Sequence, residues 1–433
     1  MPTTTQSRLR SLGAHHLRRA HAAGDDEVVA EVAEVADALS GLLDSPLAPL
    51  HEAYVGGEVA WEEWAGYKTA TYLGDVGEEL KRVRTGAVMF DMSPVVKYRI
   101  VGPDACKFLN LLTTRQMDIA PGRVRYTCWC NAAGKIIDDG TCFRVSEEEY
   151  ILFPGDLHPE HFGAVAAGLD VVVADMTSEL AALTVQGKAS LTAVQALAGP
   201  ELALLKPFSF RDYDTPAGTF RISRTGFFGD LGYELWFEPS QGEAVWNLLL
   251  EAGALPVGMT CLENARLEGG LLIPGEGFDF VPAGTEGAAA HPENRSPFEV
   301  DLGFLVSFKK EEAYIGRPAL EAEAAEGSTW QLIGLEFTIG AVAVPANGDV
   351  VKAAAGSGEA VGFVTSGLYS PSLQRTIALA SVRTAAMRAA AAPAAGVGME
   401  FVVSVDGGDV SAVGVEKPFI APERKGLTPA PAL

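Results

Sequence analysis

Two patterns of secondary structure divide this chain and limit the folds that it can adopt. Up to about residue 325, strand-like and helix-like segments alternate, as in an α+β or α/β protein. Beyond that point, short strand-like segments follow one another with turns between them, at 331–337, 348–352, 360–366, 376–382 and 400–405. Regularly spaced short strands with few helices are typical of a small barrel or sandwich. The sequence therefore predicts a mixed helix and strand region followed by a separate C-terminal β domain.

The N-terminal segment has a composition of its own. Residues 1–24 contain arginine and histidine but no acidic residue, which is a weak feature of organelle transit segments. Residues 25–43 are rich in alanine and acidic residues, with valine and leucine at helical spacing. We expect residues 1–45 to be a helical extension on a cytoplasmic protein, because no apolar stretch resembles a signal peptide or a membrane span.

Charge and cysteine content argue against several functions. The formal net charge is -23, and no cluster of Lys and Arg offers a surface for nucleic acid. The five cysteines lack paired CxxC spacing, which favours free thiols over a disulfide framework or a zinc site. Cys128 and Cys130 would lie on one face of a strand, where we expect them to pack. We expect no metal, no nucleic acid and no membrane partner, and the choice between monomer and homo-oligomer stays open.

A pair of carboxylates follows a turn signal near the middle of the first region. The turn at 131–134 separates strand-like runs at 125–130 and 135–145, and Asp138 and Asp139 come directly after two isoleucines. Because neighbouring side chains on a strand point to opposite faces, one aspartate is expected to turn inward. A buried carboxylate needs a partner or a chemical role. From the local pattern alone, an ordinary hairpin detail and a reactive group both remain open.

Short blocks along most of the chain carry a resemblance to a known family. They are VMFDMS (88–93), NAAGKIIDD (131–139), SRTGFFGDLGYEL (223–235), ARLEG (265–269), SPFEV (296–300), IGRPAL (315–320), TSGLYSPSL (365–373), IAL (377–379) and EKPF (416–419). In this order and spacing the chain resembles the aminomethyltransferase, or glycine cleavage T-protein, superfamily. The resemblance implies an α+β fold of three domains around a central folate site, with two interleaved domains over 46–325 and a β-barrel over 326–433.

The resemblance also implies a cofactor and its contacts. Tetrahydrofolate is the expected cofactor, with Asp139 near its N5 and N10 atoms and Glu234 on the pterin ring. Phe227, Phe143 and Arg266 are the further expected cofactor-binding residues. Both carboxylate roles are chemically reasonable, because a pterin presents N–H groups that a carboxylate accepts.

The sequence departs from the glycine-cleavage enzymes on the expected substrate side. Phe227 stands where the family usually has a tyrosine, and Leu262 stands where an arginine is expected. These losses of polar groups argue against a lipoyl-bound aminomethyl substrate. We expect a demethylase-like branch of the family, which moves a methyl group from a small O-, S- or N-methyl metabolite to N5 of tetrahydrofolate. The alternatives are a glycine-cleavage aminomethyltransferase and a non-catalytic folate-binding protein.

Two catalytic roles follow from that expectation. An ionised Asp139 would stabilise the positive charge that develops on N5 or take its proton. An onium donor leaves as a neutral molecule, whereas an ether needs a proton donor, for which Tyr126 is the candidate beside the carboxylate turn. For Arg266, a structural pair with Glu268 competes with a direct folate contact.

Overall fold

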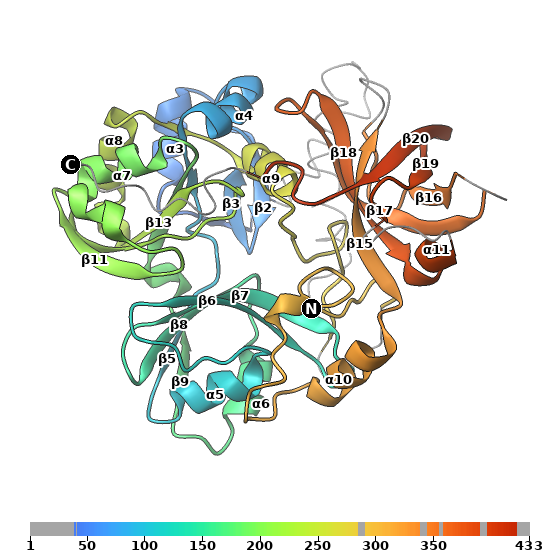
Figure 1. The fold of residues 1–433 in the computed structure, drawn as a ribbon. Helices are drawn as coiled ribbons and strands as arrows, with labels where there is room; N and C mark the ends of the chain where they lie inside the picture. Colours follow the sequence, from blue (N-terminus) through green and yellow to red (C-terminus); the bar gives the residue numbers. More distant parts are fainter. Residues whose placement is uncertain are drawn as a thin grey trace.

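The computed structural model describes residues 39, 41–284, 291–337, 344–354, 358–389 and 396–421. In Figure 1 these residues form three lobes around a common centre. The chain builds part of the first lobe, then the whole second lobe, and returns to complete the first before it enters the third. The predicted helical extension lies almost wholly outside the described residues.

The first lobe has a six-stranded sheet as its framework. Its strand order is β11 (Phe210–Thr215), β12 (Gly218–Ser223), β13 (Gly232–Phe237), β10 (Ala181–Gln186), β4 (Ala87–Asp91) and β14 (Ala254–Pro256). A small sheet of β1 (Leu43–Asp44), β3 (Tyr67–Ala70) and β2 (Trp61–Trp64) lies beside it. The helices of the first lobe are α3 (Ala48–Val55), α4 (Val76–Thr85), α7 (Ser190–Ala198), α8 (Gly242–Glu251) and α9 (Met259–Glu268). Helix α4 begins where Asp75 accepts the backbone N–H of Glu78, a normal N-cap.

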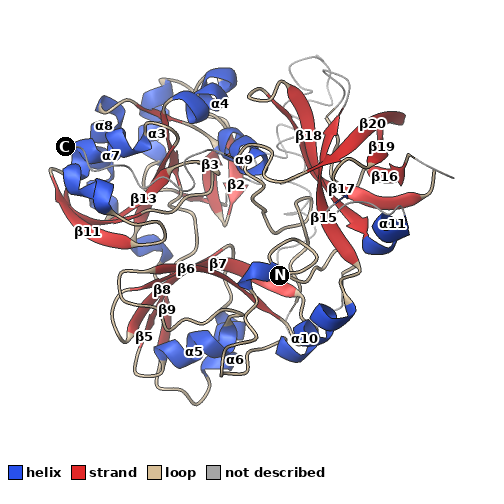
Figure 2. Ribbon diagram, viewed as in Figure 1, coloured by secondary structure: helices blue, strands red, loops and turns tan. Residues whose placement is uncertain are grey.

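The second lobe is a five-stranded sheet backed by two helices. Its strand order is β6 (Val124–Cys130), β7 (Ile136–Arg144), β8 (Glu149–Pro154), β5 (Tyr98–Val101) and β9 (Val172–Asp175). Helices α5 (Ala105–Leu112) and α6 (Pro159–Ala166) lie on the side away from the centre of the molecule, as Figure 2 shows. Their apolar side chains and one face of the sheet form a core around Phe108, Trp129 and Phe162.

The third lobe is a closed six-stranded barrel. Its strand order is β15 (Trp330–Phe337), β18 (Arg375–Arg383), β17 (Ala360–Ser370), β16 (Val350–Ala353), β19 (Glu400–Val405) and β20 (Gly408–Val415), and all of its pairs are antiparallel. Helix α10 (Arg317–Glu326) precedes the barrel, and α11 (Thr384–Ala389) follows β18. The prediction of an α+β fold with a C-terminal barrel is confirmed. The sequence prediction missed β20.

Four short 3-10 turns complete the described elements: η1 (Thr177–Glu179), η2 (Pro200–Leu204), η3 (Pro239–Gln241) and η4 (Gly303–Leu305).

Buried side chains from all three lobes meet in one apolar cluster, to which the second lobe contributes Cys128, the first Leu267 and the barrel Leu332. This cluster fixes the face of the β6–β7 hairpin that is turned toward the other two lobes. Within the described residues, no helix is long and apolar enough to cross a membrane.

Candidate active site

The β6–β7 hairpin directs the two adjacent aspartates to opposite faces of its sheet. In the strand register, Asp138 lies opposite Trp129 and Asp139 lies opposite Cys128. Trp129 belongs to the core under helices α5 and α6, whereas Cys128 belongs to the cluster between the lobes. Asp138 is therefore buried at 3% exposure on the helix side, and Asp139 is partly exposed on the face turned toward the centre. The alternation predicted from the sequence explains this separation.

Among the residues that the structure describes, the side chain that donates to Asp139 is Tyr126, whose hydroxyl donates to the Oδ2 atom. Burial, and then the neighbouring Asp138, raise the pKa of Asp139 to about 7, although the hydrogen bond from Tyr126 acts in the opposite direction. Burial and the charge of Asp139 raise the pKa of Tyr126 well above its usual value. The pair therefore holds a carboxyl group that changes charge near neutral pH and a phenol that keeps its proton.

Asp138 has a different set of partners. His158 Nε2 lies 2.7 Å from Asp138 Oδ2, and the backbone N–H of Asp156 donates to the same oxygen at 3.1 Å. The other oxygen accepts the backbone N–H of Asp139 at 2.7 Å. Asp138 thus fixes the peptide that carries Asp139 and is itself held by the segment that enters α6.

Glu234 lies on β13 of the first lobe, in register with Ser223 on one neighbouring strand and Thr184 on the other. Its Oε2 atom accepts hydrogen bonds from Thr225 Oγ1 at 2.6 Å and Ser223 Oγ at 3.3 Å. Burial raises the pKa of Glu234 to about 7 against the effect of these two donors. Glu234 and Asp139 are thus both carboxyl groups held by hydroxyls, and the structure records no ion pair for either of them among the described residues.

The other three predicted cofactor-binding residues have different surroundings. Phe227 packs, half-buried, against an apolar cluster of the first lobe that contains Leu262. Phe143 is fully buried, with Phe153 and Phe210 against its ring, and has no exposed surface for a ligand.

Arg266 forms a buried ion pair at 2.5 Å with Asp279 and donates to Ser366 of the barrel at 3.2 Å. Of the two alternatives for Arg266, the structural pair with Glu268 is wrong. Glu268 instead accepts from Arg84 at 2.7 Å, because residues two apart on a helix point in different directions. Arg266 therefore ties α9 to the barrel.

Phe304 is a neighbour of the site that the sequence prediction missed. Its ring centroid lies 6.4 Å from that of Tyr126, and its side chain is 67% exposed. The next residue, Leu305, is fully buried, and its carbonyl accepts Thr114 Oγ1 at 2.8 Å, so turn η4 is anchored while Phe304 points outward. An exposed ring beside a carboxylate and a phenol can stack on a planar ligand.

Cavities recorded in the structure lie away from these carboxylates. One, of about 270 Å³, is lined by Phe153, Arg221 and Trp236 among others. Another, of about 440 Å³, lies at the tip of the hairpin and is lined by Lys135 and Arg295 among others. No group of side chains within the described residues has the arrangement of a metal site.

Two family models match the chain. The model described as the GCVT N-terminal domain matches residues 49–310, and the model described as the glycine cleavage T-protein C-terminal barrel domain matches residues 331–420. The chain belongs to the glycine cleavage T-protein family. This family comprises tetrahydrofolate-dependent one-carbon transferases, so folate-dependent one-carbon transfer is the function at the level of the family.

Named relatives of the T-protein family agree with this assignment. An aminomethyltransferase of Clostridium botulinum (strain Loch Maree / Type A3) is 30% identical over 398 residues, covering 89% of this chain and 100% of the relative. An aminomethyltransferase of Geobacillus kaustophilus (strain HTA426) is 32% identical over 380 residues, covering 86% and 97%. The crystal structure of the glycine cleavage system aminomethyltransferase T of Bartonella henselae aligns with a TM-score of 0.73 at 22% identity, covering 88% of this chain and 98% of that chain, which shows the shared fold.

Proposed function

We propose that this protein moves a methyl group from a small O-, S- or N-methyl compound to N5 of tetrahydrofolate. The observation that carries the proposal is the apolar character of the cluster to which Phe227 and Leu262 belong. Leu262 is 7% exposed and Phe227 packs against its cluster, which also contains Phe90 and Phe228. Where this chain has Phe227 and Leu262, the family usually has a tyrosine and an arginine. This cluster therefore suits an apolar methyl-bearing group better than an aminomethyl group.

The carboxylates fit the expected cosubstrate. Asp139 and Glu234 are held by hydroxyl donors and have no recorded ion pair among the described residues, so each has acceptor capacity for ligand N–H groups. A ligand that donates such hydrogen bonds favours the ionised form of a carboxyl group whose pKa lies near 7. These two residues are therefore the ones that would hold tetrahydrofolate.

Bound tetrahydrofolate supplies the nucleophilic nitrogen. Asp139, once ionised, stabilises positive charge that develops near its carboxylate, and Tyr126 keeps that carboxylate in place. The Tyr126 proton is already donated to Asp139, which favours donors whose leaving group departs without a proton. The ring of Phe304 lies 6.4 Å from that of Tyr126 and is 67% exposed, so it is available to stack on a planar ligand.

Aminomethyl transfer is the second candidate. The relatives at 30% and 32% identity are named aminomethyltransferases, and their similarity covers most of the chain. Under this candidate the same Asp139 and Glu234 would hold tetrahydrofolate, and only the donor side would differ.

The products distinguish the two candidates. We would incubate the protein with tetrahydrofolate and a panel of methoxy-aromatic, methylsulfonio and N-methyl compounds, and separately with an aminomethyl-lipoyl protein, and identify the folate products by mass spectrometry. Formation of 5-methyltetrahydrofolate supports the proposal. Formation of 5,10-methylenetetrahydrofolate from the aminomethyl donor alone would replace it with the second candidate. Tight folate binding without any product would show a non-catalytic folate-binding protein.

A further inference from the structure

Gln186 is a fully buried polar residue of the first lobe that makes no direct hydrogen bond to either ligand-binding carboxylate. It is the last residue of β10, where it lies opposite Gly232 of β13. Residues two apart on a strand share a face, so Gln186 lies on the same face of the sheet as Thr184. Thr184 in turn lies directly opposite Glu234. Gln186 therefore belongs to the surroundings of the Glu234 carboxylate.

Two acceptors fix the amide of Gln186. Its Nε2 atom donates to Thr184 Oγ1 at 2.6 Å and to the carbonyl of Thr225 at 3.3 Å, so each of its two N–H groups has an acceptor. Because a carbonyl can only accept, the nitrogen must be the end of the amide that faces Thr225. The Oε1 atom is buried and has no hydrogen-bond partner among the described residues. The amide is therefore held by the hydrogen bonds that it donates.

Two glycines provide the space for this amide. A Cβ atom at Gly226 would overlap the Nε2 atom of Gln186, and one at Gly232 would overlap its Oε1 atom. Gly226 follows Thr225 directly, and Gly232 is the first residue of β13. The backbone at both ends of the connection between β12 and β13 thus lies against the amide, so a change at Gln186 reaches this connection.

Thr225 connects the amide of Gln186 to Glu234. Its hydroxyl donates to Glu234 Oε2 at 2.6 Å and lies 2.6 Å from Ser223 Oγ, while its carbonyl accepts Gln186. The register between β12 and β13 ends at the pair of Ser223 and Glu234. Thr225 lies beyond this last pair, so the strand ladder does not hold it. Gln186 thus holds the backbone of the residue whose hydroxyl holds Glu234.

The Thr225 hydroxyl affects the charge of Glu234. Burial raises the pKa of Glu234 to about 7, and the hydrogen bonds from Thr225 and Ser223 act in the opposite direction. Within the described part of the chain, no charged side chain shifts this pKa, because β12 presents Ser223 and β10 presents Thr184 to the carboxylate. Loss of a hydroxyl donor would therefore raise the pKa of Glu234 further.

We propose that Gln186 is a positioning residue that acts through Thr225: its amide keeps the Thr225 hydroxyl on the ligand-binding carboxylate of Glu234. Without the amide, the carbonyl of Thr225 loses its donor and the hydroxyl can leave the carboxylate. Glu234 would then ionise only at higher pH and would accept ligand N–H groups less well near neutral pH. The inference rests on the proposed function for its ligand, tetrahydrofolate.

The variants separate the amide from the hydroxyl. Gln186→Met is the primary variant, because it keeps a side chain of similar length and removes the amide. Thr225→Val removes the hydroxyl, and Thr225→Ser retains it as the conservative variant. The double variant of Gln186→Met with Thr225→Val shows whether the amide acts through Thr225. Gln186→Asn, whose shorter side chain cannot reach both acceptors, takes the place of Gln186→Met if that variant does not fold.

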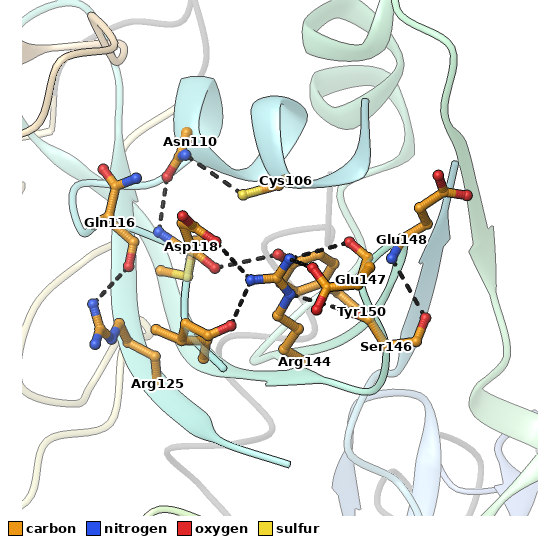
Figure 3. A network of polar contacts seen from close by, with 12 residues as sticks. Cys106, Asn110, Gln116, Asp118, Arg125, Arg144, Ser146, Glu147, Glu148 and Tyr150 are labelled. Carbon is orange, nitrogen blue, oxygen red and sulfur yellow. Dashed lines mark hydrogen bonds and ion pairs between the residues drawn. The ribbon is translucent and has the colours of Figure 1, made fainter. Parts of the chain in front are cut away.

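Asn110 offers a matched control, because it is a buried amide that holds a loop elsewhere. Figure 3 shows it on helix α5 of the second lobe, where its Oδ1 atom accepts the backbone N–H of Met117 at 2.8 Å. Asn110 is 1% exposed, and α5 covers the face of the sheet opposite to Asp139. Asn110→Leu should lower the temperature of unfolding and leave the titration of Glu234 unchanged.

Two measurements are made on each variant. Carbon-13 NMR of glutamate-labelled protein follows the titration of Glu234 without ligand, and Glu234→Gln assigns its signal. Calorimetry as a function of pH follows the affinity for tetrahydrofolate. Gln186→Met and Thr225→Val should each raise the midpoint of the Glu234 titration by about one pH unit and weaken folate binding about tenfold near pH 6. Thr225→Ser and Asn110→Leu should keep the wild-type midpoint.

The double variant decides the route of the effect. A midpoint equal to that of Thr225→Val alone supports the inference. A wild-type midpoint in the Gln186 variant would overturn it, and so would a double variant in which the two shifts add. Failure of the wild-type protein to bind tetrahydrofolate would refute the proposed function, whereas the titration without ligand would still decide the role of Gln186.

Discussion

Replacing Tyr126 with phenylalanine separates an electrostatic role of this residue from a role as proton donor. The hydroxyl of Tyr126 donates to Asp139, whose pKa is raised to about 7 by burial and then by Asp138. A hydrogen bond to a charged group contributes about 1.5–3 kcal/mol, and each pKa unit corresponds to about 1.4 kcal/mol. Because Asp139 is partly exposed, we take the lower end, so Tyr126→Phe should raise the pKa of Asp139 by about one unit.

The direction of the pH effect follows from which form is active. If ionised Asp139 supports methyl transfer, the wild-type rate rises with pH through about 7. Tyr126→Phe moves this rise upward by about one pH unit, so its rate should be about tenfold lower near pH 6 and equal to the wild-type rate near pH 9. The assay is the pH profile of kcat/KM for formation of 5-methyltetrahydrofolate.

Tyr150→Phe provides the matched control for loss of a buried phenol. Tyr150 lies on β8 of the same sheet, and its hydroxyl donates to the carbonyl of Met117 instead of Asp139. Its profile should keep the wild-type midpoint. A rate for Tyr126→Phe that is reduced by the same factor at every pH would refute the electrostatic reasoning and show direct proton donation or substrate positioning by Tyr126.

Three further substitutions test the remaining parts of the site. Burial raises the pKa of Glu234 to about 7, so tetrahydrofolate should bind more tightly as pH rises through that value; Glu234→Gln should weaken binding about tenfold near pH 8 and remove the pH dependence in equilibrium titrations. Arg266→Ala leaves Asp279 buried without its cation and should lower the free energy of unfolding in urea by about 3–5 kcal/mol. Gly140→Ala would put a Cβ atom 2.3 Å from the carbonyl oxygen of Phe153, so the strands must separate, with a loss of about 1–3 kcal/mol in urea unfolding and a lower rate from displaced Asp139.

Each of these substitutions has a control within the chain. Glu238→Gln removes an exposed carboxylate next to β13 and should leave folate affinity unchanged. Arg99→Ala breaks the more exposed pair with Glu149 and should change the free energy of unfolding by at most about 1 kcal/mol. Gly57→Ala adds a Cβ atom with nothing within 4 Å, so its unfolding should match the wild type. Equal effects in a substitution and its control would contradict the corresponding argument.

Secondary structure was predictable where the local pattern was strong. Five of the barrel strands have alternating or continuous apolar residues, and they appear in the structure near their predicted bounds. Strand β20 consists largely of glycine, serine, alanine and valine, and its first half is exposed, so its period of two was not visible. Strand β20 follows β19 across a tight turn, and its pairing with β15 is a contact between segments far apart in the sequence, which no local window contains.

The site was predictable only in part, for a similar reason. The alternation of side chains along β7 predicts that Asp138 and Asp139 point to opposite faces of the sheet. It does not predict that His158, at the start of α6, contacts Asp138, or that Asp279 forms an ion pair with Arg266. These partners come from segments joined by the tertiary fold, and a helical spacing of two residues could have ruled out the Arg266 pair with Glu268 in advance.

The different partners of the two aspartates explain how one hairpin can hold a carboxyl group ready for chemistry. Asp138 is held by His158 and two backbone N–H groups, so its position is fixed. That fixed charge lies next to Asp139 and raises its pKa, while Tyr126 limits the rise. A single buried aspartate in the same place would lack this neighbouring charge. The two carboxylates therefore have different roles. Asp138 holds Asp139 in position and raises its pKa. Asp139 faces the centre of the three lobes, where the proposed methyl transfer needs a negative group to stabilise positive charge.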